Sequence, residues 1–250
     1  MTYCVGLYLR EGLVLLGDTR TNAGVDHVST FGKLHVTEAA GERVLALLTA
    51  GNLAITQAVV ARLAEGVWLD GAQRTLLGVE SMFHAAQLVG AAVRDVFARD
   101  GQALASQGVG FDCSFLLGGQ IAGGPPRLYL VYAAGNFIEA TEDTPFLQIG
   151  EVKYGKPILD RALTFDTALA DGVKLVLVSM DSTLRSNLTV GMPIDLALIG
   201  TDALRVTLRR RITEEDDYFR FVRERWSAAL REAYQQLPPP DWMQAGRPAG

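Results

Sequence analysis

The chain has 250 residues, with 23 Lys or Arg and 28 Asp or Glu, so its formal net charge is −5. This length is enough to bury one substantial core, and the mild acidity excludes the basic surface that nucleic-acid binding requires. The sequence has no apolar run near the roughly 18 residues of a membrane span and no signal-like N-terminus. We therefore expect a single cytoplasmic domain over residues 1–250, with neither nucleic acid nor a membrane as partner.

The N-terminal part of the chain predicts strands followed by helices. An apolar hairpin opens the chain, because two segments rich in Val, Leu and Tyr flank the turn at Arg10, Glu11 and Gly12. The second of these strands is almost continuously apolar, so we expect it to be covered on both faces. The expected strands are 2–9, 12–17, 34–37 and 43–50, and the expected helices are 53–63 and 76–98.

The remaining chain predicts a second antiparallel sheet, further helices and a long C-terminal helix. Gly, Pro and Asp turn signals bound the short apolar segments that follow the second predicted helix. Thr213, followed by acidic residues, is typical of a helix start, and Pro238 ends that helix. The expected strands are 113–117, 127–132, 137–140, 146–149, 193–199 and 203–210, and the expected helices are 155–163, 167–180 and 213–237, before a tail over 238–250.

Thr2 is a candidate nucleophile. Initiator methionine is normally excised before a residue this small, so removal of Met1 would place a free α-amine beside the threonine hydroxyl. An N-terminal amine has a reference pKa of about 7.7 to 8.0 and is therefore partly neutral near pH 7. It would take the proton of its own hydroxyl, so that one residue supplies both nucleophile and base.

Two charged residues fall where they would assist Thr2. Asp18 ends the second predicted strand, and the hairpin returns it to the start of the first strand, while Lys33 precedes the third strand. A buried lysine would be held charged by the carboxylate, and its cation would lower the proton affinity of the hydroxyl. Taken singly, Asp18 also fits a turn residue, Lys33 a solvated edge-strand lysine and Gly51 a turn glycine.

Together these residues resemble a known family. The opening residues, Gly17-Asp18, Lys33 ahead of the third strand and Thr49-Ala50-Gly51 before a helix resemble proteasome β subunits and HslV. The segments 1–6, 18–26 and 179–188 look more specifically like Anbu, and the match spans about residues 1–200. The resemblance implies an α+β fold, the four-layer αββα sandwich of the N-terminal-nucleophile hydrolases, with an added C-terminal helix.

The resemblance also implies site roles. Thr2 would attack a peptide carbonyl, Lys33 with Asp18 would tune it, and the backbone N–H of Gly51 would face the oxyanion. Two positions depart from proteasome subunits: Glu151 stands in place of a serine in Gly-Ser-Gly, and Ser186 replaces the aspartate of Arg-Asp-x-x-Ser. Residues flanking these motifs are expected to form the substrate pocket, and they are Thr21, Phe31, His35 and Thr49.

The resulting hypothesis is a self-compartmentalising threonine peptidase, built from identical subunits in a ring or helical assembly and acting on peptide or protein substrates, with or without an ATPase partner. Two alternatives remain open: an amidase of the same chemistry acting on a small amide, and a ring-forming scaffold without catalysis. No cofactor or metal is expected, because His27, His35 and His84 lack metal-ligand spacing, as do Cys4 and Cys113.

Overall fold

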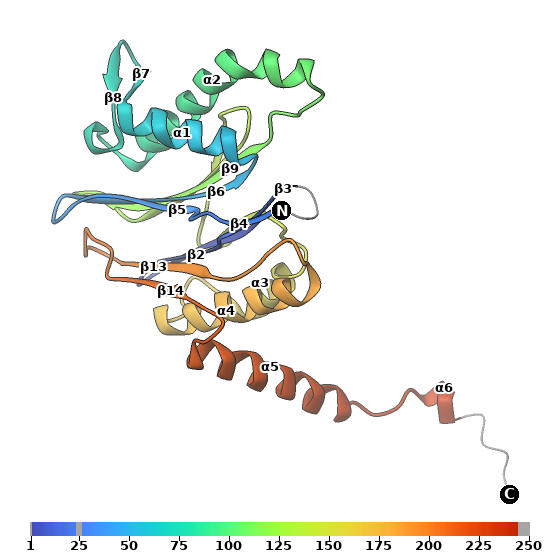
Figure 1. The fold of residues 1–250 in the computed structure, drawn as a ribbon. Helices are drawn as coiled ribbons and strands as arrows, with labels where there is room; N and C mark the ends of the chain where they lie inside the picture. Colours follow the sequence, from blue (N-terminus) through green and yellow to red (C-terminus); the bar gives the residue numbers. More distant parts are fainter. Residues whose placement is uncertain (1, 24–26, 245–250) are drawn as a thin grey trace, which may run out of the picture.

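The computed structural model describes residues 2–23 and 27–244, so Met1 and residues 245–250 of the predicted tail lie outside the described part. Two five-stranded antiparallel sheets stack face to face, and helices cover the outer side of each (Figure 1). The first sheet has the order β12–β1–β2–β13–β14 and the second β11–β10–β9–β6–β5. The four-layer αββα sandwich expected from the sequence is therefore confirmed.

The first sheet consists of β1 (Tyr3–Leu9), β2 (Gly12–Asp18), β12 (Phe146–Gly150), β13 (Ile194–Gly200) and β14 (Leu208–Ile212). The second consists of β5 (Leu34–Ala39), β6 (Arg43–Gly51), β9 (Cys113–Ile121), β10 (Arg127–Val131) and β11 (Phe137–Glu139). The covering helices are α1 (Leu53–Glu65) and α2 (Met82–Ser106) on the second sheet, and α3 (Lys156–Ala162) and α4 (Leu169–Ser186) on the first.

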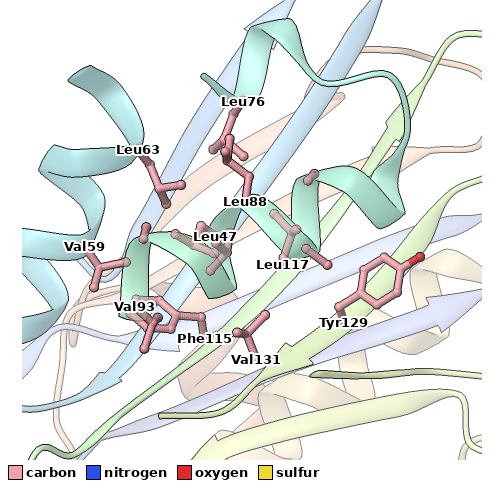
Figure 2. Close-up of a cluster of buried hydrophobic side chains, with 14 of the residues drawn as sticks. Leu47, Val59, Leu63, Leu76, Leu88, Val93, Phe115, Leu117, Tyr129 and Val131 are labelled. Carbon is pink, nitrogen blue, oxygen red and sulfur yellow. The ribbon is translucent and has the colours of Figure 1, made fainter. Parts of the chain in front are cut away.

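Three separate hydrophobic clusters hold the four layers together. Leu47, Phe115 and Tyr129 pack beneath α1 and α2, as Figure 2 shows. A second cluster lies between the first sheet and helices α3 and α4, and a third lies between the two sheets. Strands β1 and β2 contribute to both of the latter clusters because their alternate side chains point to opposite faces. The hairpin that carries the candidate nucleophile is thus buried on both faces.

The grouping of strands into sheets differs from the sequence prediction. We expected the first four strands to form one sheet and the four strands over 113–149 a second. Instead β5 and β6 join β9, β10 and β11, whereas β12 pairs with β1. Local periodicity marks where a strand lies but carries no information about its long-range partner, which explains the error.

Several boundaries also differ. Helix α2 starts at Met82 rather than residue 76, because Ser81 caps it by accepting a hydrogen bond from the His84 N–H. Residues 76–78 instead form the short helix η1 (Leu76–Gly78). The sequence analysis missed two small hairpins, β3 (Arg20–Ala23) with β4 (His27–Thr30) and β7 (Val67–Leu69) with β8 (Ala72–Arg74).

The C-terminal helix α5 (Asp217–Gln235) leaves the body of the molecule and is followed by the short α6 (Asp241–Gln244) (Figure 1). It is capped by Asp216, whose carboxylate accepts from the Phe219 N–H at 2.9 Å, and not by Thr213 as predicted. Within residues 2–23 and 27–244, no helix combines the length and apolarity needed to cross a membrane.

Candidate active site

A buried ion pair lies at the end of the first hairpin. The Lys33 Nζ donates to Asp18 Oδ1 at 2.6 Å and to the Arg20 carbonyl at 2.7 Å. The Asp18 carboxylate also accepts from the backbone N–H of Tyr3 at 3.1 Å and of Gly191 at 3.2 Å. Burial raises the pKa of the Asp18 carboxyl, and the Lys33 ammonium opposes that rise. The carboxylate thus accepts from one cation and two backbone N–H groups.

Thr2 sits beside this pair, at the start of β1. It is 8% exposed, and its carbonyl accepts from the Glu151 N–H at 2.7 Å. The next residue, Tyr3, contributes its N–H to Asp18, so the carboxylate that binds Lys33 also fixes the backbone after Thr2. Asp18 therefore links Lys33 to the backbone next to Thr2, so the three predicted residues lie close together.

A chain of hydrogen bonds on the other face of β1 fixes Tyr3. The Gln148 side-chain amide donates to the Tyr3 hydroxyl at 2.6 Å, the hydroxyl lies 2.6 Å from Ser179 Oγ, and Ser179 donates to the Gly155 carbonyl at 3.0 Å. Burial raises the pKa of the Tyr3 hydroxyl to about 12, so it remains a neutral donor. The strand that carries Thr2 is therefore anchored to α4.

A cavity of about 160 Å³ opens at Thr2. Of the nine predicted site residues, Thr2, Thr21, Lys33, Thr49 and Gly51 line it, and Asp18 lies behind Lys33. The remaining lining residues were not predicted, and they are Asn22, Ala50, Leu53, Thr56 and Gly150. One cavity therefore brings together most of the residues that the sequence singled out.

Thr21, one of the residues that line this cavity, has an unsatisfied side-chain hydroxyl. Its Oγ1 is buried, and among the described residues it has no hydrogen-bond partner. Buried hydroxyls normally find a partner, because an unpaired one costs about 1–3 kcal/mol.

Gly51 is required at its position for a reason that the sequence did not reveal. The resemblance implied only that the Gly51 N–H would face the oxyanion. The structure gives Gly51 a φ of +108°, and an added Cβ would lie 2.4 Å from the Asp112 carbonyl oxygen. Both the left-handed backbone and the close contact between β6 and β9 exclude a side chain.

Besides Asp18, three predicted residues do not line the cavity. Phe31 is 39% exposed, and His35 lines a different, larger groove between β5 and α1. His35 points toward the helices because its neighbour Leu34 points between the sheets, and side chains alternate along a strand. Ser186 is exposed at the last turn of α4, which continues six residues beyond the predicted end at residue 180.

Asn187, the residue after Ser186, is hydrogen-bonded to Glu151, the residue that follows Gly150 of the cavity lining. Its Nδ2 donates to Glu151 Oε2 at 3.0 Å, and its Oδ1 accepts from Thr189 Oγ1 at 2.6 Å. Asn187 was not predicted, because its bond to Glu151 joins residues 36 positions apart in the sequence. Glu151, which departs from the Gly-Ser-Gly pattern of proteasome subunits, was the available signal in the sequence, because a carboxylate calls for a donor such as the Asn187 amide.

The described residues include no group of three or more His, Cys, Asp or Glu that could hold a metal ion. Both cysteines are free and buried. Cys4 packs between the sheets, and burial raises the pKa of its thiol. A buried thiol of this kind is a poor nucleophile, so Thr2 is the stronger candidate.

Solved structures resemble this chain along nearly its whole length. It is 49% identical to an Anbu, described as an ancestral β-subunit, from Yersinia bercovieri, with a TM-score of 0.88 over 95% of this chain and 99% of that one. It is 52% identical to a helical assembly of the Anbu complex from Pseudomonas aeruginosa, with a TM-score of 0.89 over 95% and 98%. Anbu from Hyphomicrobium sp. strain MC1 is 48% identical, with a TM-score of 0.86 over 95% and 99%. No family model and no curated protein matches the chain.

Proposed function

Because the chain belongs to the Anbu family of proteasome-like proteins, we propose that it is an N-terminal threonine hydrolase that cleaves peptide bonds with Thr2. The observation that carries this proposal is the buried Lys33–Asp18 ion pair beside Thr2, at the edge of the cavity. Met1 lies outside the described residues, and the proposal requires that it be removed.

The proposed reaction begins when the Thr2 Oγ1 attacks the substrate carbonyl carbon and its proton passes to the Thr2 α-amine. The nearby Lys33 ammonium favours the loss of that proton. The oxyanion of the tetrahedral intermediate accepts a hydrogen bond from the Gly51 N–H, and such a donor is worth about 2.7–4 kcal/mol. The α-ammonium then gives its proton to the leaving amine as the C–N bond breaks, which leaves an ester on Thr2.

Water completes the cycle. The α-amine takes a proton from the attacking water, the ester bond breaks, and the hydroxyl of Thr2 recovers a proton as the acid product leaves.

We place this chemistry in the cytoplasm, where two free thiols such as Cys4 and Cys113 remain reduced. Thr21, with its unpartnered hydroxyl, and Thr49 are the proposed contacts for the substrate.

We further propose that identical subunits assemble through α5. The face of α5 that packs on the body through Phe219 and Val222 continues beyond the body as Leu230 and Tyr234, which are 51% and 61% exposed. Leu237, which is 71% exposed, follows two residues after the end of the helix. The body of the molecule covers only the first part of this apolar stripe. We propose that a second copy of the chain packs against the exposed remainder. A related Anbu forms a helical assembly, which supports self-association.

A covalent label tests the hydrolase proposal. Purified protein is treated with a short peptide that ends in a vinyl sulfone, and the adduct is located by peptide mass mapping. We expect the label on Thr2 of a chain that lacks Met1, no label in Thr2→Ala, and label retained in Thr2→Ser, which keeps a hydroxyl. Protein that lacks Met1 and still takes up no label would instead favour a scaffold without catalysis.

A further inference from the structure

Glu151 is a buried carboxylate next to Thr2 that the mechanism above does not use. It follows Gly150 at the end of β12, is 7% exposed, and binds the Thr2 carbonyl through its own N–H at 2.7 Å. Gly150 is paired with Tyr3 in the ladder between β12 and β1, so Glu151 and Thr2 are neighbours across the two strands. A buried carboxylate costs free energy unless it is paired with a cation or hydrogen-bonded, so the partners of the Glu151 carboxylate matter.

The side chain of Glu151 is held from one direction by Asn187. The Asn187 Oδ1 accepts from both the N–H of Thr189 at 2.9 Å and its hydroxyl at 2.6 Å. Two donors on one side of the amide fix which end is oxygen, so its Nδ2 must face Glu151 Oε2, 3.0 Å away. Asn187 is itself fixed, since its backbone N–H donates to the Thr183 carbonyl at the end of α4.

This arrangement leaves acceptor capacity on the carboxylate. A carboxylate offers about four lone-pair sites. Among the described residues, Glu151 accepts from Asn187 Nδ2 and, at 3.4 Å, from the Lys153 N–H. The processed N-terminus would bring a cationic group with three N–H donors to the neighbouring residue.

We propose that Glu151 is the acceptor for the α-amine of processed Thr2, and that Asn187 and Thr189 hold its carboxylate in position. This inference rests on the proposed function, because the amine exists only once Met1 is removed. An opposite charge on the neighbouring residue of the paired strand favours the ammonium over the neutral amine. Glu151 therefore steadies the ammonium that forms during attack, but it also limits the supply of neutral base at pH 7, so reactivity rises as the medium becomes alkaline.

Other charged groups surround Thr2. Asp18 on β2 and Lys33 before β5 neutralise each other at 2.6 Å. The Asp195 carboxylate on β13 is likewise paired with Arg211 on β14, at 2.8 Å. Arg20 on β3 donates to the Leu188 carbonyl. Glu151 is thus the carboxylate beside Thr2 for which the described residues provide no cation.

The test measures the titration of the amine directly. Processed protein is exposed to brief pulses of acetic anhydride between pH 5 and pH 10, and acetylation of the Thr2 α-amine is followed by mass spectrometry. Only the neutral amine reacts, so the midpoint of the curve reports its pKa. The variants are Glu151→Gln, which keeps the shape and removes the charge, Glu151→Asp, which keeps the charge, and the control Glu142→Gln, an exposed residue beyond the opposite end of β12.

We expect the midpoint of Glu151→Gln to fall by about 1 to 3 pH units, that of Glu151→Asp to recover part of the shift, and that of Glu142→Gln to match the wild type. Equal midpoints in Glu151→Gln and the wild type would overturn the inference. Glu151 would then have only the structural role of holding the segment after α4 through its hydrogen bond with Asn187. If Glu151→Gln does not fold, the wild-type midpoint decides, with a value above about 8 as the expected result and any lower value against it.

The two proposals fail in different ways. An amine that titrates as expected on a chain whose Thr2 hydroxyl takes up no vinyl sulfone upholds the role of Glu151 and rejects hydrolysis. If the Thr2 hydroxyl is labelled but the midpoint of Glu151→Gln equals that of the wild type, the hydrolase proposal stands and the role of Glu151 is rejected. Intact mass shows whether Met1 has been removed, and a chain that retains it overturns both.

Discussion

Lys33 and Asp18 are among the most deeply buried charges in the described residues, with side-chain exposures of 5% and 0%. Each charge is tolerated because the other is 2.6 Å away and because backbone groups satisfy the remaining donors and acceptors. Removing one partner of such a pair leaves an uncompensated charge in a poorly solvated place and typically costs about 3–5 kcal/mol. The pair thus serves the proposed chemistry and the stability of the first hairpin together.

We predict that Lys33→Met and Asp18→Asn each lower the free energy of unfolding by about 3–5 kcal/mol, whereas the double variant loses clearly less than the sum. Urea unfolding of the four proteins measures this coupling. Lys156→Met, which breaks the exposed Lys156–Asp160 pair, is the control and should change stability little. Strictly additive losses would show that the two buried charges do not depend on each other.

The sequence allowed some of these residues to be identified but not others. Asp18 and Lys33 could be predicted because each lies at a strand end that local patterning locates correctly. Ser186 was selected because it aligns with the aspartate of the Arg-Asp-x-x-Ser pattern, and an alignment does not show which side chain at the end of α4 bonds to Glu151. Thr21 was predicted as a pocket residue, but its unpartnered hydroxyl is visible only in three dimensions.

At the scale of elements, the junction between β12 and β1 positions Thr2, the proposed nucleophile. Gly150 ends β12 with a φ of +81°, and a Cβ there would lie 1.9 Å from the Thr2 carbonyl oxygen. Because backbone occupies that space, a side chain at 150 must displace the start of β1. The sequence marked this stretch only as a departure from the Gly-Ser-Gly pattern, since a long-range strand pairing creates the contact.

We predict that Gly150→Ala reduces labelling of Thr2 at least tenfold and destabilises the fold, because it combines a left-handed alanine with a backbone clash. Gly41→Ala is a matched control: its φ of +79° imposes the same strain, but nothing lies within 4 Å of an added Cβ. Comparing the labelling rates and urea midpoints of the two variants separates the effect of the clash with Thr2 from that of the strained alanine backbone. Equal behaviour of both variants would mean that the contact with Thr2 has no consequence.

Strand and helix positions were largely predictable, while sheet membership was not. The turn residues and apolar runs that define β1, β2, β5 and β6 are local features of the sequence. The decision that β12 pairs with β1, and not with its sequence neighbours, depends on contacts between residues more than 140 positions apart. The fold class was recovered through resemblance to a family, because strand periodicity alone fits more than one sheet arrangement.

For the whole molecule, the outstanding feature is the C-terminal helix that extends past the body (Figure 1). Its first half is tied to α4, where the buried Asp181 accepts from Arg185 at 3.0 Å and from Arg223 at 2.7 Å. Its second half carries the exposed apolar stripe described above. A single helix with an uncovered apolar face gains stability by packing against another surface.

We predict that the double variant Leu230→Lys and Tyr234→Lys reduces the particle mass measured by light scattering, because two charges interrupt the stripe. Glu232→Lys changes the net charge by the same amount on the opposite face of α5 and should leave the mass unchanged. Circular dichroism controls for folding. An unaltered mass in the double variant would exclude α5 as the assembly surface.

The central claim is that one residue supplies both the attacking hydroxyl and the accepting amine. A peptide epoxyketone tests this directly, because its ketone takes up a hydroxyl and its epoxide is opened by an amine, and both groups of an N-terminal threonine are needed to close a ring. We expect a single adduct with the full inhibitor mass on Thr2, formed with the wild type and lost in Lys33→Met. No ring adduct on folded wild-type protein that lacks Met1, or an adduct that persists without Lys33, would contradict the account.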